Sequence, residues 1–183
     1  MKPVIVARGP QILIVEYDGW PEYYEAEKRN INIAVRGLFP AMEHIGSTAV
    51  PGLAAKPVVD ILAGTRSLED GPAIAAMLQP LRYVQLPFLT PDRLFFLKRG
   101  TDTPEGVDLD HPGYNIHVLP IDRFYEDEEI LLRDYLRAHP EVVAEYARLK
   151  CEIVGRISNY REYTPAKNDF VRRALADARA ERR

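Results

Sequence analysis

The chain has 183 residues, a length that suits one domain able to bury roughly 70% of its unfolded surface. Apolar residues make up 46% and charged residues 28% of it, which is typical of a globular protein and excludes a disordered one. The net charge of −3 gives the whole molecule no electrostatic attraction for polynucleotides, so no specific nucleic-acid partner is predicted.

Membrane and secretory signals are not evident in the sequence. No apolar run approaches the length of a membrane span, and charge and glycine interrupt residues 1–9 too early for a secretory signal. The one cysteine, Cys151, excludes a disulfide within the chain and fits a reducing compartment. We therefore expect a cytoplasmic protein that does not bind membranes.

The N-terminal third begins with a strand and a helix. Residues 12–17 form an apolar run that predicts a strand. Asp18 follows as a helix cap, and an apolar stripe at helical spacing predicts a helix over about 21–38. Pro40 is expected to end this helix.

The middle of the chain is predicted to be mainly strands. Short apolar runs predict them over 42–45, 58–63, 83–86, 94–98 and 115–119. A helix is predicted over 67–78, and residues 101–113, rich in Asp, Gly and Pro, predict an exposed loop. Because strand side chains alternate, Asn115 and His117 should share one face of the last strand.

From Phe124 onward the pattern is helical. The acidic run 126–129 suits a helix start, where the dipole favours negative charge, and Glu129 is four residues from Arg133, a spacing that allows an ion pair. His139-Pro140 should break the helix, and Thr164-Pro165 should cap the last one. The layout predicts one α+β domain over 1–183: a mixed sheet flanked by helices over about 10–120, then a C-terminal helical segment over about 121–183.

Chemistry-bearing residues gather between the strands at 42–45 and 58–63. Gly46 lets backbone N–H groups approach an anion, Ser47 and Thr48 add hydroxyls, and Lys56 adds charge. Asp60 stands among branched aliphatic residues, where a carboxylate is costly unless it is paired, hydrogen-bonded or bound to metal. This order of residues suits a site for a phosphorylated ligand with Mg²⁺.

A family resemblance rests on the same stretch. Gly-Ser followed about a dozen residues later by an acid in an apolar strand is the pattern of the nucleotidyltransferase superfamily. The longer segment HIGSTAVPGLAAKPVVDIL resembles the GrpB family within that superfamily, and shorter matches extend the resemblance from about residue 10 to about 178. It implies a nucleotidyltransferase-like sheet in which Gly46 and Ser47 contact nucleotide phosphates.

The chain departs from the superfamily at its acids. Nucleotidyltransferases usually have a second acid where this chain has Leu62, and a third on a later strand that here offers Asn115 and His117. Asp60 and His117 are therefore the candidates for metal ligation and catalysis, with Mg²⁺ or Mn²⁺ as the expected ion. The run 108–111, Asp-Leu-Asp-His, is a second source of acids, although such runs are usually solvated turns.

Basic residues farther along complete the candidate site. Lys150 and Lys167 lie in local patterns shared with the GrpB family and are expected to reach a phosphate if the C-terminal helices close over the sheet. Arg133, Asp134 and Arg137 are expected to form a partly buried ion network. His44 is a weaker candidate for proton transfer or metal ligation.

Two functions follow from these residues. The first is transfer of a nucleotidyl group from a nucleotide, held with a divalent metal, to an acceptor that the sequence does not name. The alternative is a catalytically degenerate module that binds a nucleotide or a coenzyme A metabolite, since GrpB relatives are also found joined to dephospho-coenzyme A kinase.

Overall fold

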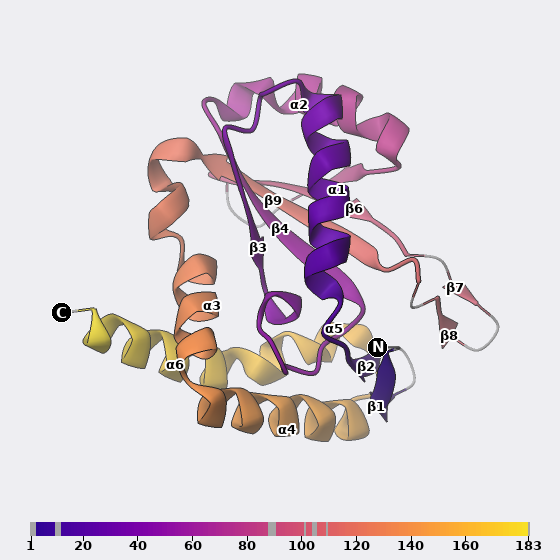
Figure 1. Cartoon of the computed structure of the whole chain (residues 1–183), viewed down its shortest axis with the longest axis vertical. Coiled ribbons are helices and arrows are strands. Elements are labelled where there is room, and N and C mark those ends of the chain that lie inside the picture. Colours follow the sequence, from indigo (N-terminus) through magenta and orange to yellow (C-terminus); the bar gives the residue numbers. More distant parts are fainter. Residues whose placement is uncertain are drawn as a thin grey trace.

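The structure, a computed structural model, describes residues 3–9, 12–87, 91–100, 102–103, 106–108 and 110–182. Its main feature is a five-stranded sheet in the order β3-β4-β9-β6-β5 (Figure 1). The strands are β3 (Ala41–Ile45), β4 (Val58–Thr65), β5 (Val84–Leu86), β6 (Leu94–Lys98) and β9 (Gly113–Pro120). β4 and β9 run parallel and the other neighbours antiparallel, so the sheet is mixed, as predicted.

Two helices cover one face of the sheet. They are α1 (Trp20–Val35) and α2 (Gly71–Leu78), which crosses the upper end of α1 in Figure 1. Val59 and Ile61 of β4, together with Ile116 and Val118 of β9, pack against these helices in the main hydrophobic core. The intervening side chains of both strands therefore project from the opposite face.

The C-terminal helices lie on that opposite side. Figure 1 shows α3 leading down from the sheet to α4 and α6 at its lower end. The helices are α3 (Glu128–Ala138), α4 (Pro140–Arg156), α5 (Tyr160–Tyr163) and α6 (Asn168–Glu181). Val50 and Leu53 of the loop after β3 share one buried cluster with Leu136, Tyr146 and Phe170 of these helices. The Gly-Ser loop is therefore packed against the C-terminal segment.

The N-terminal region differs from the prediction in three ways. β1 (Val4–Arg8) was not predicted and pairs with β2 (Leu13–Glu16) as a separate antiparallel hairpin. The Asp18 cap is wrong, because Gly19 is the N-cap of α1 and no side chain caps it. α1 ends at Val35, where Arg36 adopts a left-handed conformation, and so stops before Pro40.

Later boundaries also shift. The predicted loop over 101–113 contains two short paired strands, β7 (Asp102–Thr103) and β8 (Gly106–Val107), while residues 101, 104, 105 and 109 lie outside the described residues. Residues 121–126 form a 3₁₀ segment before α3. The Thr164 cap is wrong: residues 165–167 form a 3₁₀ turn without a side-chain cap, and α6 starts at Asn168. None of the helices in the described ranges is long and apolar enough to cross a membrane.

Candidate functional site

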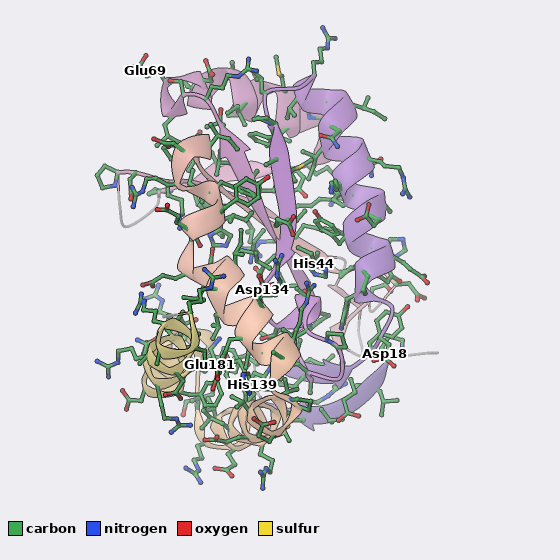
Figure 2. All side chains as sticks on the ribbon, turned by 60° about the vertical axis from the view of Figure 1, so that its left-hand side comes forward. Asp18, His44, Glu69, Asp134, His139 and Glu181 are labelled. Atoms are coloured by element: carbon green, nitrogen blue, oxygen red, sulfur yellow. The ribbon has the colours of Figure 1, made fainter. Side chains whose placement is uncertain are left out.

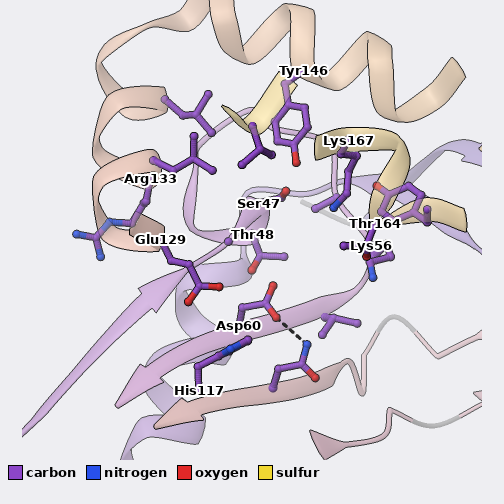
Figure 3. A pocket seen from close by; sticks show the side chains of 18 of the residues that line it. Ser47, Thr48, Lys56, Asp60, His117, Glu129, Arg133, Tyr146, Thr164 and Lys167 are labelled. Carbon is purple, nitrogen blue, oxygen red and sulfur yellow. Dashed lines mark hydrogen bonds between the residues drawn. The ribbon is translucent and has the colours of Figure 1, made fainter. Parts of the chain in front are cut away.

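A cavity of about 390 Å³ lies between the open face of the sheet and the C-terminal helices (Figure 3). Asp60 of β4, Phe95 of β6, and Asn115 and His117 of β9 form its floor. Residues 46–48 and Lys56 form one wall, and side chains from α3, α4 and the segment 163–171 close it from above. The sheet and the helical segment thus contribute to one partly open cavity of the size that small-molecule ligands occupy.

Gly46 and Asp60 approach so closely that no side chain fits between them. Gly46 has a φ of +70°, which glycine adopts without strain, and a Cβ placed on it would lie 2.5 Å from Asp60 Oδ2. The pairing of Ile45 with Asp60 across β3 and β4 brings the two residues together. The expected Gly-Ser loop therefore lies directly against the expected carboxylate.

The parallel pairing of β4 and β9 places Asn115 beside Asp60 and His117 beside Leu62. Asn115 donates a hydrogen bond from Nδ2 to Asp60 Oδ1 at 2.7 Å. Among the described residues, Asn115 Oδ1 is buried and has no hydrogen-bond partner. An unsatisfied acceptor beside a carboxylate is a costly arrangement, and it marks this floor as a place where a ligand or ion can supply the missing contact.

Glu129 is a cavity residue that the sequence prediction missed. It lies in the first turn of α3, and its carboxylate projects toward Asp60 and His117 (Figure 3). The predicted pair with Arg133 is wrong, because Glu129 Oε2 accepts from Arg93 Nη1 at 2.8 Å instead. Burial raises the pKa of the Glu129 carboxyl, and His117 and Arg93 oppose this shift.

Two lysines meet at the other end of the cavity. Lys56 Nζ lies 5.2 Å and Lys167 Nζ 4.6 Å from the centre of the Tyr163 ring. Burial and the nearby charge of Lys56 lower the pKa of Lys167 to about 8, while Asp60 opposes the shift. The two ammonium groups near the Tyr163 ring repel each other, and an anion bound between them would stabilise both.

The Gly-Ser loop contacts the sheet on one side and α4 on the other. Thr48 Oγ1 lies 3.0 Å from His44 Nε2, and Ser47 lines the cavity together with Tyr146. Burial raises the pKa of Tyr146 to about 12, so this phenol stays protonated at neutral pH. The sheet thus supports the loop through Thr48, and Val50 and Leu53 of the same loop pack against Tyr146 of α4.

The sequence of this chain matches a known protein family over most of its length. Residues 11–177 match the family described as GrpB protein. The chain belongs to the GrpB family. A UPF0157 protein of Pseudomonas aeruginosa is 37% identical over 164 residues, which are 88% of this chain and 64% of that protein. The chain thus spans less than two thirds of that relative.

Two further matches place the GrpB chain among known proteins. The crystal structure of the conserved protein GrpB from Enterococcus faecalis superposes with a TM-score of 0.75 at 23% identity and covers 96% of each chain, which shows a shared fold. The dephospho-CoA kinase of Mycobacterium bovis is 28% identical over 164 residues, which are 80% of this chain and 40% of that protein.

Lys150 of this GrpB chain lies behind the cavity wall. Its side chain is 1% exposed, does not line the cavity, and donates from Nζ to the carbonyl oxygen of Ala54. Burial, with Lys167 and Lys56 adding to it, lowers the pKa of Lys150 well below the ordinary value. The expected direct phosphate contact is therefore replaced by a contact with the backbone two residues before Lys56.

His44 lies on the wrong face of β3 for the site. It pairs with Ile61 and stacks on the Tyr24 ring of α1 at 4.8 Å. Figure 2 shows His44 on the side of the sheet that faces α1. Burial and, to a smaller extent, the charges of Arg137 and Arg133 together lower its pKa to about 3, so the ring is neutral. His44 supports Thr48 from below and does not line the cavity.

The predicted ion network is confirmed. Arg133 Nη1 donates to Glu43 Oε2 at 2.7 Å and to the His44 carbonyl oxygen at 2.9 Å, and Arg133 Nε donates to Asp134 Oδ1 at 2.8 Å. Arg137 Nε donates to the Ala49 carbonyl oxygen at 2.9 Å. Because Arg133 also lines the cavity, this network joins α3 to β3 at the site.

The acids at 108–111 do not contribute to the cavity. Asp108 Oδ2 lies 2.6 Å from His111 Nδ1, and neither residue lines the cavity, nor does Asp110. Leu109 lies outside the described residues. Within the described part of the chain, no three His, Cys, Asp or Glu side chains are close enough together to hold a metal ion by themselves.

Proposed function

We propose that the cavity binds a nucleotide or another phosphorylated small molecule together with one divalent cation, Mg²⁺ or Mn²⁺, and that this GrpB protein transfers a nucleotidyl group to an acceptor. The observation that supports the proposal is the polarity of the cavity. Lys56 and Lys167 lie at one end, Glu129 and His117 at the other, and Asp60 between them (Figure 3). Gly46 lies directly against Asp60. A phosphate chain with a bound cation matches that order of charges.

The side chains that line the cavity suit a single Mg²⁺ ion and not a two-metal centre. A two-metal centre needs several carboxylates, and the described residues bring no such group together. A single Mg²⁺ commonly uses one or two carboxylates and completes its shell with water and ligand phosphates. Asp60 is the residue that would hold it, with His117 close by, and the ion would neutralise phosphate charge.

The alternative is binding without transfer. Leu62 stands where a nucleotidyltransferase would present its second acid, and the later strand offers Asn115 and His117 in place of a third, which supports a module that has kept the site and lost the reaction. The similarity to a stretch of a dephospho-CoA kinase supports coenzyme A metabolites as ligands to be tried. Such ligands, like the one thiol Cys151, suit a cytoplasmic location.

A thermal-shift panel tests the proposal. The panel holds the four nucleoside triphosphates, coenzyme A and dephospho-coenzyme A, each with Mg²⁺, Mn²⁺ or neither. A ligand at 100 times its Kd should stabilise the protein by about 2.7 kcal/mol. We expect a cation-dependent shift that Asp60→Asn abolishes and that the exposed control Asp177→Asn retains. A flat panel would overturn the proposal.

Product analysis then separates the two functions. The nucleotide that gives the shift is incubated with Mg²⁺ and candidate acceptors, and the mixture is separated by chromatography. Pyrophosphate and a nucleotidylated acceptor, both lost in Asp60→Asn, would support transfer. Saturable binding without products in every metal would support the binding module.

A further inference from the structure

The acid that the strands lack has a counterpart on a helix. Glu129 is the second carboxylate of the cavity, besides Asp60, among the described residues. It comes from α3, whereas Leu62, Asn115 and His117 lie on strands β4 and β9. Figure 3 shows its carboxylate opposite Asp60 across the cavity floor.

Local contacts fix the direction of Glu129. Asp127 is the N-cap of α3, and its Oδ1 accepts a hydrogen bond from the Glu129 backbone N–H at 2.9 Å. Arg93 pairs with both Asp127 and Glu129 from outside the cavity. Arg93 lines a second cavity of about 550 Å³, and Glu129 lines both, so the Glu129 carboxylate stands in the wall between them. The helix start therefore holds this carboxylate over the site.

Two carboxylates facing each other across a small cavity repel one another. The charge of Asp60 is one of the influences that raise the pKa of Glu129, after burial and together with Asp127. Arg93 offsets part of the repulsion from one side only. A cation placed between the two groups would convert this repulsion into attraction.

We propose that Asp60 and Glu129 together hold one divalent cation, and that Glu129 of α3 replaces an acid that the strand positions 62, 115 and 117 do not provide. The oxygens of two carboxylates are hard ligands of the kind that Mg²⁺ and Mn²⁺ prefer, whereas the imidazole of His117 suits Mg²⁺ poorly. Asn115 donates from Nδ2 to Asp60 Oδ1 and so fixes the direction of that carboxylate. Gly46 leaves Asp60 Oδ2 open to the cavity, because only a hydrogen atom lies over it.

The proposal deepens the proposed function, which supplies the phosphate oxygens that would complete the ion's shell. The inference also adds a condition to the proposed function. A cation site built from β4 and α3 forms only when the C-terminal segment is packed on the sheet. Removal of α3 from its place would then abolish cation binding even with β4 intact.

A purely structural role for Glu129 predicts a different response to substitution. If Glu129 serves only to pair with Arg93, then Glu129→Gln and Arg93→Gln break the same ion pair and should act alike. If Glu129 binds a cation, the two variants should act in opposite directions, because loss of Arg93 removes a competing positive charge.

The experiment is a titration of the full chain with Mn²⁺ alone, followed by the electron paramagnetic resonance signal of the free ion. We expect saturable binding to the wild type, weakened about tenfold or more by Glu129→Gln and by Asp60→Asn. Arg93→Gln should bind Mn²⁺ as tightly as the wild type or more tightly. The matched control is Glu128→Gln, since Glu128 is exposed and pairs with Arg179 instead. Far-UV circular dichroism checks that each variant is folded.

Each outcome decides the matter. Equal affinity of Glu129→Gln and wild type, or no saturable Mn²⁺ binding, would overturn the inference. Loss of nucleotide binding in Asp60→Asn with no effect of Glu129→Gln would leave the proposed function standing without the inference. Mn²⁺ bound by both carboxylates beside a flat nucleotide panel would leave the inference standing without the proposed function.

Discussion

Gly46 occupies a position that no other residue fits. Its φ of +70° with a ψ of −170° belongs to a region that is essentially restricted to glycine. A Cβ there would also press against Asp60 Oδ2. The backbone conformation and the proximity to the carboxylate thus make two separate demands on the same residue.

The variant Gly46→Ala separates these demands when it is compared with Gly52→Ala. Gly52 has a φ of +72° and open space where a Cβ would stand, so both variants should lose about 1–3 kcal/mol of stability from backbone strain. Gly46→Ala should lose more, because Asp60 must move, and it should also lose Mn²⁺ and nucleotide binding. Urea unfolding and ligand titration measure the two effects. Equal binding by the two alanine variants would contradict the role given to Gly46.

Of the two carboxylates in the cavity, one could be predicted from the sequence and the other could not. Asp60 was predictable, because a carboxylate among branched aliphatic residues has few structural explanations. Glu129 was missed, because an acid at a helix start is explained equally well by the helix dipole. A signal was present: residues 129, 132, 133 and 136 lie on one helical face, and all four line the cavity.

At the scale of elements, alternation was predictable and pairing was not. The period of two in 115–119 correctly separated Asn115 and His117 from the core residues Ile116 and Val118. The partner strand and its register depend on contacts between residues 55 apart in sequence, which short-range patterns do not contain. The same limit explains the error over His44, whose face is set by its pairing with Ile61.

Helix ends show a related limit. The apolar stripe in α1 predicted the helix, but the predicted last turn to residue 38 is wrong. The helix ends at Val35, because Arg36 and Gly37 adopt positive φ values. The buried position of Lys150 followed from the packing of α4 against the loop at Ala54, and a lysine in a helical pattern carries no mark of such burial.

Two separate segments form the cationic end of the cavity, and their pairing predicts a pH dependence. Lys56 comes from the loop before β4 and Lys167 from the turn before α6, and their ammonium groups share the Tyr163 ring. The pKa of Lys167 is lowered to about 8, so the side chain is charged below that pH and loses its charge above it. Anion affinity should therefore be highest below pH 8 and fall as the pH rises through that value.

Sulfate is a suitable probe for this prediction, since it keeps one charge state throughout the range. Titration of the protein with sulfate at constant ionic strength, followed by NMR between about pH 6.5 and 9.5, should show weakening above pH 8. Lys167→Gln should bind weakly at every pH and remove the dependence. Lys28→Gln, which alters a lysine stacked on Tyr24 of α1, is the control. A wild-type affinity that does not change across the range would refute the prediction.

The whole molecule is held together by packing that crosses from the sheet to the C-terminal helices. Val50 and Leu53 follow the Gly-Ser loop, and they share a buried cluster with Phe170 of α6. At the far end of the same helix, Glu181 lies 3.1 Å from His139 at the junction of α3 and α4 (Figure 2). A site formed between two parts requires these contacts, because the parts must keep one relative position.

The variant Phe170→Ala tests whether the two parts unfold together. Phe170 is 4% exposed and stacks on Tyr146 at 4.3 Å, and removal of its ring should cost about 3–5 kcal/mol. Trp20, the one tryptophan, is buried in the main core between α1 and the sheet, far along the chain from Phe170. If the chain is one cooperative unit, the urea midpoint reported by Trp20 fluorescence should fall together with the midpoint from far-UV circular dichroism.

The exposed control Arg172→Ala should leave both midpoints nearly unchanged. If Phe170→Ala instead lowers only the dichroism midpoint, the C-terminal helices unfold as a separate unit and the single-domain prediction is wrong. That result would bear on function as well. The cavity walls from α3 to α6 would then detach while Asp60 and Gly46 stayed in place, and ligand binding would have to stabilise the helical segment on the sheet at each encounter.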